Sequence, residues 1–210
     1  MVADWLTGAA SKGGHIALTG GTTPELAYKE AAQREPDWSK TELWWSDERC
    51  VPPDDDLSNY ALAKRTLLNR LDRDPSAVHR IKGELGKEKA AADYELELGD
   101  TVFDLELLGI GKDGHVASLF PNAATLQHSK RVLPAEPGLE PYVDRVTLSI
   151  PTLNSAREIV FALSGAEKAE AARRAFGATP SPDTPASLVR AHDGRTTAIL
   201  DRAAAARLRA

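Results

Sequence analysis

Short apolar runs alternate with helical stretches along almost the whole chain, and this alternation restricts the fold more than any other feature. The apolar runs lie at 16–18, 43–45, 102–108, 143–150, 159–163 and 197–200. Helical periodicity is found between them at 24–33, 59–71, 87–98 and 166–176. Strands that alternate with helices form a mostly parallel sheet that is covered on both faces. We therefore expect one α/β domain over 1–210, a three-layer α/β/α Rossmann-like fold.

Some of the expected helices carry signals at their ends. Thr22 or Thr23 stands just before Pro24, and proline favours the first turn of a helix. Ser58 is a typical N-cap for the helix that follows it. The alanine-rich segment 203–206 predicts a helix near the C-terminus.

Composition excludes several classes of protein. A formal net charge of -5 argues against nucleic acid as a partner, because polyanion binding needs a basic face. The single cysteine, Cys50, rules out an intrachain disulfide and fits a reducing compartment. No apolar run approaches the roughly 20 residues that cross a bilayer, and the first ten residues lack the basic start of a signal peptide. We expect a cytoplasmic protein, with no membrane partner, that is a monomer or a weak homo-oligomer.

The first candidate site is a glycine turn between an expected strand and helix. Gly20 and Gly21 are followed by Thr22, Thr23 and Pro24. Backbone N–H groups at the start of a helix bind anions, and glycine lets a phosphate approach closely. The alternative interpretation is a tight turn with an N-cap. No Gly-Lys-Ser/Thr follows, so the segment is not a Walker loop.

A charged segment follows the next expected strand. Asp47, Glu48 and Arg49 lie where open α/β sheets place their ligand-binding loops, so they can form a charged wall around a polar substrate. A salt-bridge cluster on the surface is the alternative. Cys50 is next to Arg49, but a catalytic thiol also needs a base at hydrogen-bond distance, so we expect an idle cysteine.

The strongest site signal is the loop after the strand at 102–108. This loop contains three glycines and holds Asp113 and His115 on either side of Gly114. Glycine lets the backbone fold tightly around a ligand. Both polar side chains are expected to reach the crevice at the carboxyl edge of the sheet.

Two cations later in the chain are candidates for an anion clamp. Arg145 lies on an expected strand, and Lys168 lies at the start of an expected helix. Arginine offers a fork of donors to a phosphate, and lysine offers a point charge. The three consecutive aspartates at 54–56 are expected to diverge on a solvated loop, so no metal site is expected there.

Together these segments resemble the 6-phosphogluconolactonase family, which belongs with glucosamine-6-phosphate deaminases in a larger group of sugar-phosphate enzymes. The resemblance covers 18–201 in the family's order and includes Ser58-Asn59-Tyr60. Its most specific element is Asp113-Gly114-His115 followed by Ser118-Leu119-Phe120-Pro121. The deaminases share the Asp-Gly-His but continue with Asn-Glu-Pro.

The resemblance implies an activity and a set of site residues. The activity is hydrolysis of 6-phosphogluconolactone in the oxidative pentose phosphate pathway, without a metal or an organic cofactor. The residues implied to receive the 6-phosphate are Gly20, Gly21, Thr22, Arg145 and Lys168. The residues implied to act at the lactone are His115, with Asp113 and Arg49 nearby. The residues implied to line the rest of the cleft are Asp47, Asn59 and Gly114.

Three alternatives stay open. One is an isomerase-deaminase with Asp47 as the base, against which Arg49 and the segment 119–121 count. A second is a sugar-phosphate sensor without turnover. A third is an inactive fold, because the family usually has an extra stretch before the glycine turn and only 18 residues precede Thr19. That difference is expected to weaken packing or to expose a sheet edge.

Overall fold

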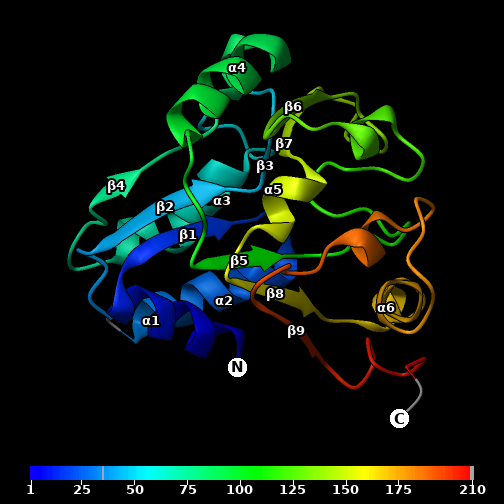
Figure 1. Cartoon of the computed structure of the whole chain (residues 1–210). Coiled ribbons are helices and arrows are strands. Elements are labelled where there is room, and N and C mark those ends of the chain that lie inside the picture. Colours follow the sequence, from blue (N-terminus) through cyan, green and yellow to red (C-terminus); the bar gives the residue numbers. More distant parts are fainter. Residues whose placement is uncertain (35, 209–210) are drawn as a thin grey trace.

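A six-stranded sheet runs through the middle of the computed structural model, which describes residues 1–34 and 36–208 (Figure 1). The strand order is β4-β2-β1-β5-β8-β9, and every neighbouring pair is parallel. The strands are β1 (Gly14–Leu18), β2 (Thr41–Trp45), β4 (Ala77–Val78), β5 (Leu105–Leu108), β8 (Glu158–Leu163) and β9 (Arg195–Leu200). The expected parallel sheet is confirmed.

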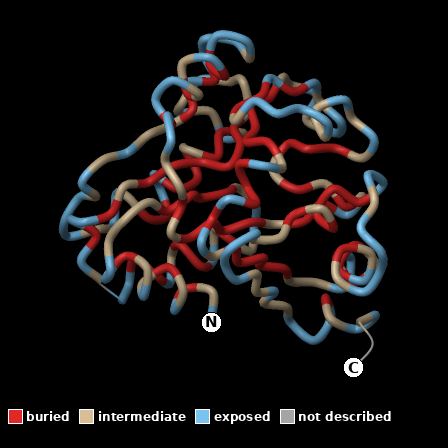
Figure 2. The backbone as a smooth tube through the Cα atoms, viewed as in Figure 1, coloured by how far each residue is buried: buried red, intermediate tan, exposed pale blue. Residues whose placement is uncertain are grey.

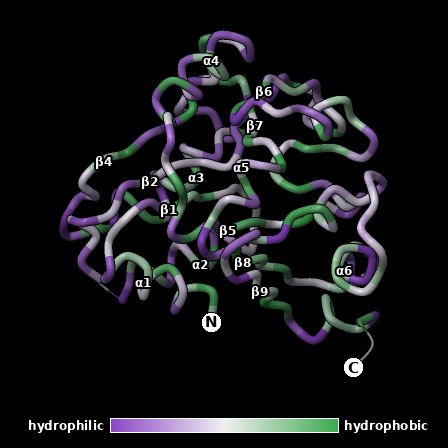
Figure 3. The backbone as a smooth tube through the Cα atoms, viewed as in Figure 1, coloured by the Kyte–Doolittle hydropathy of each residue, from purple (hydrophilic) through white to green (hydrophobic). Residues whose placement is uncertain are grey.

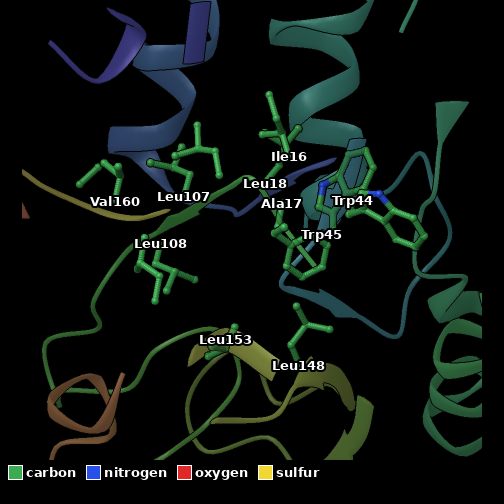
Figure 4. Packing of buried hydrophobic residues seen from close by; sticks show 14 of the residues in the cluster. Ile16, Ala17, Leu18, Trp44, Trp45, Leu107, Leu108, Leu148, Leu153 and Val160 are labelled. Carbon is green, nitrogen blue, oxygen red and sulfur yellow. The ribbon is translucent and has the colours of Figure 1, made fainter. Parts of the chain in front are cut away.

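Helices cover both faces of this sheet. They are α1 (Val2–Lys12), α2 (Thr22–Gln33), α3 (Asn59–Thr66), α4 (Lys87–Leu98), α5 (Ile150–Asn154) and α6 (Ala169–Phe176). In Figure 1, α1 and α2 lie on one side of the sheet and α4 and α5 on the other. Side chains alternate accordingly: Leu107 and Val160 point to one side, and Leu108 points to the other, toward Leu153 of α5 (Figure 4). The three-layer prediction is therefore confirmed, and none of the described helices is long and apolar enough to span a membrane.

The sheet is also the centre of the hydrophobic core. Its central strands β1, β2, β5 and β8 are mostly buried (Figure 2), and the same segments carry much of the apolar sequence (Figure 3). Burial on both faces explains why these strands read as unbroken apolar runs instead of alternating ones.

A second, antiparallel sheet lies beside α4 and α5. It has the order β3-β7-β6, with β3 (Asp47–Arg49), β7 (Arg145–Leu148) and β6 (Val132–Ala135). The apolar run at 143–150 was expected in the parallel sheet, and it instead forms β7 and the start of α5. Ser46 joins the two sheets, since its N–H donates to Leu18 at 2.9 Å and its carbonyl accepts from Leu148 at 2.8 Å. Strand pairing at this distance in sequence is not visible in local apolar patterns.

Most helix predictions are confirmed, with changes at the ends. The segment 59–71 divides into α3 and a 3-10 turn (Leu68–Arg70), and 166–176 divides into a 3-10 turn (Ala166–Lys168) and α6. Ser58 caps α3 as expected, since its hydroxyl accepts from the Ala61 N–H at 3.0 Å.

Two predictions about helix ends are wrong. Gly21 is the N-cap of α2, so Thr22 and Thr23 lie inside the helix and neither caps it. The segment 203–206 forms turns instead of a helix. Asp201 organises these turns by accepting from the Ala204 N–H at 2.7 Å.

The N-terminal segment does not leave β1 exposed. β1 pairs with β2 on one side and with β5 on the other, and the sheet ends at β4 and β9. Sequence analysis missed α1, which precedes β1. Its buried residues Ala3, Leu6 and Ala10 recur at helical spacing, so a signal was present.

An unpartnered carboxyl group lies inside the core. Glu106 of β5 is fully buried, and neither of its carboxylate oxygens has a hydrogen-bond partner within the described residues. Its neighbours in register are Ala17 and Ile159. Burial raises the pKa of Glu106 well above its ordinary value of 4.5, because the charged form cannot be solvated there.

This group makes a prediction about stability. Glu106→Leu is expected to raise the free energy of unfolding by about 2 kcal/mol near pH 7, the order of the cost of burying an unpaired polar group. The raised pKa means that the folded state binds more protons than the unfolded state above pH 4.5. Wild-type stability therefore falls as pH rises from that value. Denaturant unfolding of both proteins between pH 4.5 and 8 should show a gap that widens with pH, and a constant gap would contradict this account.

Candidate active site

A cavity opens at the edge of the parallel sheet where the order of strand addition reverses. The chain adds β2 and β4 on one side of β1, and then β5, β8 and β9 on the other, so the carboxyl ends of β1 and β5 form a topological switch point. The cavity has a volume of 320 Å³. Its lining residues are Thr19, Gly20, Gly21, Thr22, Thr23, Pro24, Asp47, Arg49, Asn59, Gly109, Ile110, Gly111, Lys112, His115, Ala117, Leu139, Ala162 and Lys168.

The glycine turn forms one end of the cavity. Gly21 has φ 105°, which favours glycine, and α2 begins directly after it. A Cβ on Gly20 would lie 1.9 Å from the Asn59 side-chain oxygen, so only glycine fits against α3. Gly20, Gly21 and Thr22 thus stand at a helix N-terminus that faces the cavity, which is suitable for an anion.

Lys168 also lines the cavity. Its ammonium group donates to the Ile110 carbonyl at 2.7 Å. Burial lowers the pKa of Lys168, and the nearby charge of Lys112 adds to this effect. Thr23 and Ser164 share a hydroxyl hydrogen bond of 2.7 Å, which ties the first turn of α2 to the end of β8. A half-buried ammonium beside a helix N-terminus is an electropositive site for a phosphate dianion.

His115 also lines the cavity, and a carboxylate orients its imidazole. Its Nδ1 lies 2.6 Å from Oδ1 of Asp113. Burial alone would raise the pKa of Asp113, but the hydrogen bond and charge of His115 lower it. An ionised carboxylate only accepts, so Nδ1 carries the hydrogen and Nε2 keeps its lone pair. Within the described part of the chain, Nε2 of His115 has no hydrogen-bond partner, and it is free to accept a proton.

The loop glycines hold this imidazole in place. A Cβ on Gly111 would lie 2.0 Å from Nδ1 of His115, so the position admits no side chain. The Gly111 N–H donates to the His115 carbonyl at 2.9 Å, and the Gly114 N–H donates to the Gly111 carbonyl at 3.0 Å. Both N–H groups are therefore occupied within the loop. Gly114, with φ 100°, packs against Thr184. It was expected to line the cavity, and it does not.

Asp47 and Asn59 also line the cavity. Oδ1 of Asp47 accepts from the Asn59 amide at 3.1 Å, and Oδ2 accepts from the Ser118 hydroxyl at 2.7 Å. Asp47 is 5% exposed. The structure thus brings both predicted residues to the cavity, and it fixes the Asp47 carboxylate by two side chains.

Glu48 is not part of a surface salt-bridge cluster, which was the alternative for this segment. It is buried, and its carboxylate accepts from the backbone N–H groups of Arg49, Asn59 and Tyr60 and from the Ser58 hydroxyl. These contacts place a negative charge at the N-terminus of α3, where the helix dipole favours it. Glu48 therefore holds β3 against α3.

The two arginines differ in position. Arg49 lines the cavity and donates through Nη1 to the Leu57 carbonyl, while its buried Nε has no partner within the described residues. Arg145 does not line the cavity. Its guanidinium donates to the carbonyls of Val143 at 3.0 Å and Pro141 at 2.9 Å. The position of Arg145 therefore does not support the predicted contact with a phosphate.

Several lining residues were missed by sequence analysis. Lys112 is exposed at the cavity rim and lies between two glycines of the loop that was singled out, so its charge was a usable signal. Leu139 comes from a loop between β6 and β7 whose approach to the cavity has no local signal.

Cys50 was expected to be an idle cysteine. Burial and the charges of Asp144 and Glu48 raise the pKa of its thiol to about 11, so little reactive thiolate forms. No group of three potential metal-binding side chains is found in residues 1–34 and 36–208.

Known proteins resemble this chain in both sequence and structure. The family model described as "Glucosamine-6-phosphate isomerases/6-phosphogluconolactonase" matches residues 3–198. The 6-phosphogluconolactonase of Mycobacterium tuberculosis is 37% identical over 209 residues, covering 92% of this chain and 84% of that protein. The crystal structure of a protein called devB has a TM-score of 0.89 at 31% identity, covering 99% of this chain and 95% of that one. The crystal structure of 6-phosphogluconolactonase from Thermotoga maritima has a TM-score of 0.83 at 30% identity, covering 95% of each chain. The chain therefore belongs to the glucosamine-6-phosphate isomerase/6-phosphogluconolactonase family.

Proposed function

We propose that this protein is an enzyme that hydrolyses the lactone of 6-phosphogluconolactone. The observation that carries the proposal is the pairing of Asp113 with His115, which lines a cavity that the glycine turn and Lys168 also line. The relatives named as 6-phosphogluconolactonases over most of the chain support the same substrate.

The phosphate is proposed to bind at the glycine turn. The residues that line the cavity there supply the N–H groups at the start of α2, the hydroxyls of Thr22 and Thr23, and the Lys168 ammonium. Burial lowers the pKa of Lys168, and the negative charge of a bound dianion stabilises its ammonium form. The phosphate thus anchors the sugar so that the lactone carbonyl reaches His115.

Hydrolysis then needs a base that activates water and a positive charge that stabilises the oxyanion of the intermediate. Nε2 of His115 removes a proton from water as the water oxygen bonds to the lactone carbonyl carbon. The C–O bond to the ring oxygen breaks, and the imidazolium returns its proton to that oxygen, giving a hydroxyl and a carboxylic acid. Arg49 supplies positive charge to the intermediate, because the N–H groups of Gly111 and Gly114 are already bonded within their loop.

The chemistry needs no metal or organic cofactor, since a lactone is an activated ester. We place the reaction in the cytoplasm, in a monomer or weak homo-oligomer, and without a nucleic-acid partner. The net charge of -5 and the single cysteine support these statements.

The family also contains isomerases of amino-sugar phosphates, so two assays separate the candidates. In the isomerase-deaminase alternative, Asp47 is the base, but both of its carboxylate oxygens already accept hydrogen bonds. We expect acid release from the phosphorylated lactone and no ammonia release from glucosamine 6-phosphate. Ammonia release would favour the isomerase. A ligand-induced rise in Tm without either product would favour a sensor.

A further inference from the structure

The loop 136–142 between β6 and β7 is fastened at its C-terminal end by Arg145. This guanidinium is 5% exposed and donates to the carbonyls of Pro141 and Val143. The same loop brings Leu139 to the cavity wall. Arg145 therefore holds a segment that reaches the active site, although its own side chain does not line it.

A lysine fastens both ends of the loop to α4. The ammonium group of Lys87 bonds to Glu136 at one end and lies 3.1 Å from Asp144, two residues beyond the other end. The Asp144 carbonyl accepts from the Cys50 N–H at 2.8 Å, which adds a link to the strand region after β3. With its ends held, the middle of the loop is pressed against the residues beneath it.

The residue beneath the middle of the loop is Phe120. A Cβ built on Gly138 would lie 2.3 Å from Cγ of the Phe120 ring and 2.4 Å from Cδ1. The backbone of Gly138 thus rests directly on the ring, and any side chain at this position has to displace it. Phe120 is 8% exposed, so little space is open to receive a displaced ring.

Phe120 in turn packs against the imidazole of His115. The ring centroids are 5.1 Å apart, with an angle of 52° between the ring planes. Asp113 holds Nδ1 of the imidazole, and Gly111 lies against the Nδ1–Cε1 edge. The phenyl ring is therefore a further contact that limits the orientation of the imidazole.

We propose that Gly138 and Phe120 are positioning residues, through which the fastened loop 136–142 sets the orientation of the His115 imidazole. The inference rests on the proposed role of His115 as the base. Neither residue needs to touch the substrate. A small displacement of Phe120 rotates or shifts Nε2, and a misplacement of about 1 Å can cost up to ~100-fold in rate.

The test compares two glycine-to-alanine substitutions. Gly138→Ala should lower kcat about 10-fold, with KM unchanged within roughly twofold, because ring displacement alters the base and leaves the phosphate site intact. Gly8→Ala in α1 is the matched control, since a Cβ there meets nothing within 4 Å. Phe120→Leu is a second variant, expected to act in the same direction. Unchanged kcat in both folded variants, or a rise in KM alone, would overturn the proposal.

A spectroscopic measurement separates this inference from the proposed function. The imidazole ¹⁵N shifts of His115, assigned by their loss in His115→Ala, report its tautomer and its bond to Asp113 without any substrate. They should change in Gly138→Ala and stay as in wild type in Gly8→Ala. Unchanged shifts in Gly138→Ala would refute the positioning role. Wild-type turnover by His115→Ala would instead refute the role of His115 as the base, and a wild-type protein that does not hydrolyse the lactone would refute the proposed function, whatever the shifts show.

Discussion

His115→Ala is expected to lower kcat by about 10²-fold or more, which is the usual contribution of a general base, while KM changes little. The reason is that Nε2 of His115 is the free nitrogen of an imidazole whose Nδ1 is held by Asp113 at 2.6 Å. The substitution leaves the glycine turn and Lys168, where the phosphate is proposed to bind, unchanged. Steady-state kinetics on freshly generated lactone measure the effect.

The matched control for this substitution is His128→Ala. His128 is exposed and does not line the cavity, so its removal should leave kcat unchanged. Near-normal turnover by a folded His115→Ala protein would remove His115 from the mechanism.

Lys168→Ala is expected to weaken binding of the phosphorylated lactone by roughly 10- to 100-fold, since a charge-assisted contact is worth about 1.5–3 kcal/mol. The unphosphorylated lactone should lose little, because it has no dianion for Lys168 to contact. KM and inhibition constants for the two substrates measure the difference. Lys89→Ala, at an exposed lysine of α4, serves as the control.

Arg145→Ala gives the contrasting pattern. Because its guanidinium holds the loop 136–142 and does not line the cavity, its loss should affect both lactones alike. A selective loss for the phosphorylated lactone in Arg145→Ala, and an equal loss for both in Lys168→Ala, would reverse the assignment of the anion site.

The sequence contains most of what positions the candidate site. The parallel sheet could be predicted because strands buried on both faces appear as apolar runs. The glycine turn could be predicted because Gly20 and Gly21 stand between an expected strand and an expected helix. The loop of Asp113 and His115 was also found: His115 lines the cavity, whereas Asp113 contacts the imidazole without lining the cavity itself. These features are local, so a short stretch of sequence holds the signal.

What sequence analysis missed depends on long-range packing. The antiparallel pairing of β7 with β3 joins segments far apart in the chain, and it places Arg145 in a sheet that apolar patterns do not reveal. The approach of Gly138 to Phe120 depends on the same arrangement. The burial of Glu106 was also not predicted, because apolar patterning does not lead one to expect an ionisable residue in a buried strand.

The central claim is most directly tested by acid release from freshly generated 6-phosphogluconolactone, followed at constant pH with spontaneous hydrolysis subtracted. The account predicts a rate that is proportional to protein concentration, saturates with substrate and is almost lost in His115→Ala. A rate equal to spontaneous hydrolysis at all protein concentrations, from protein that is folded and binds the lactone, would contradict it.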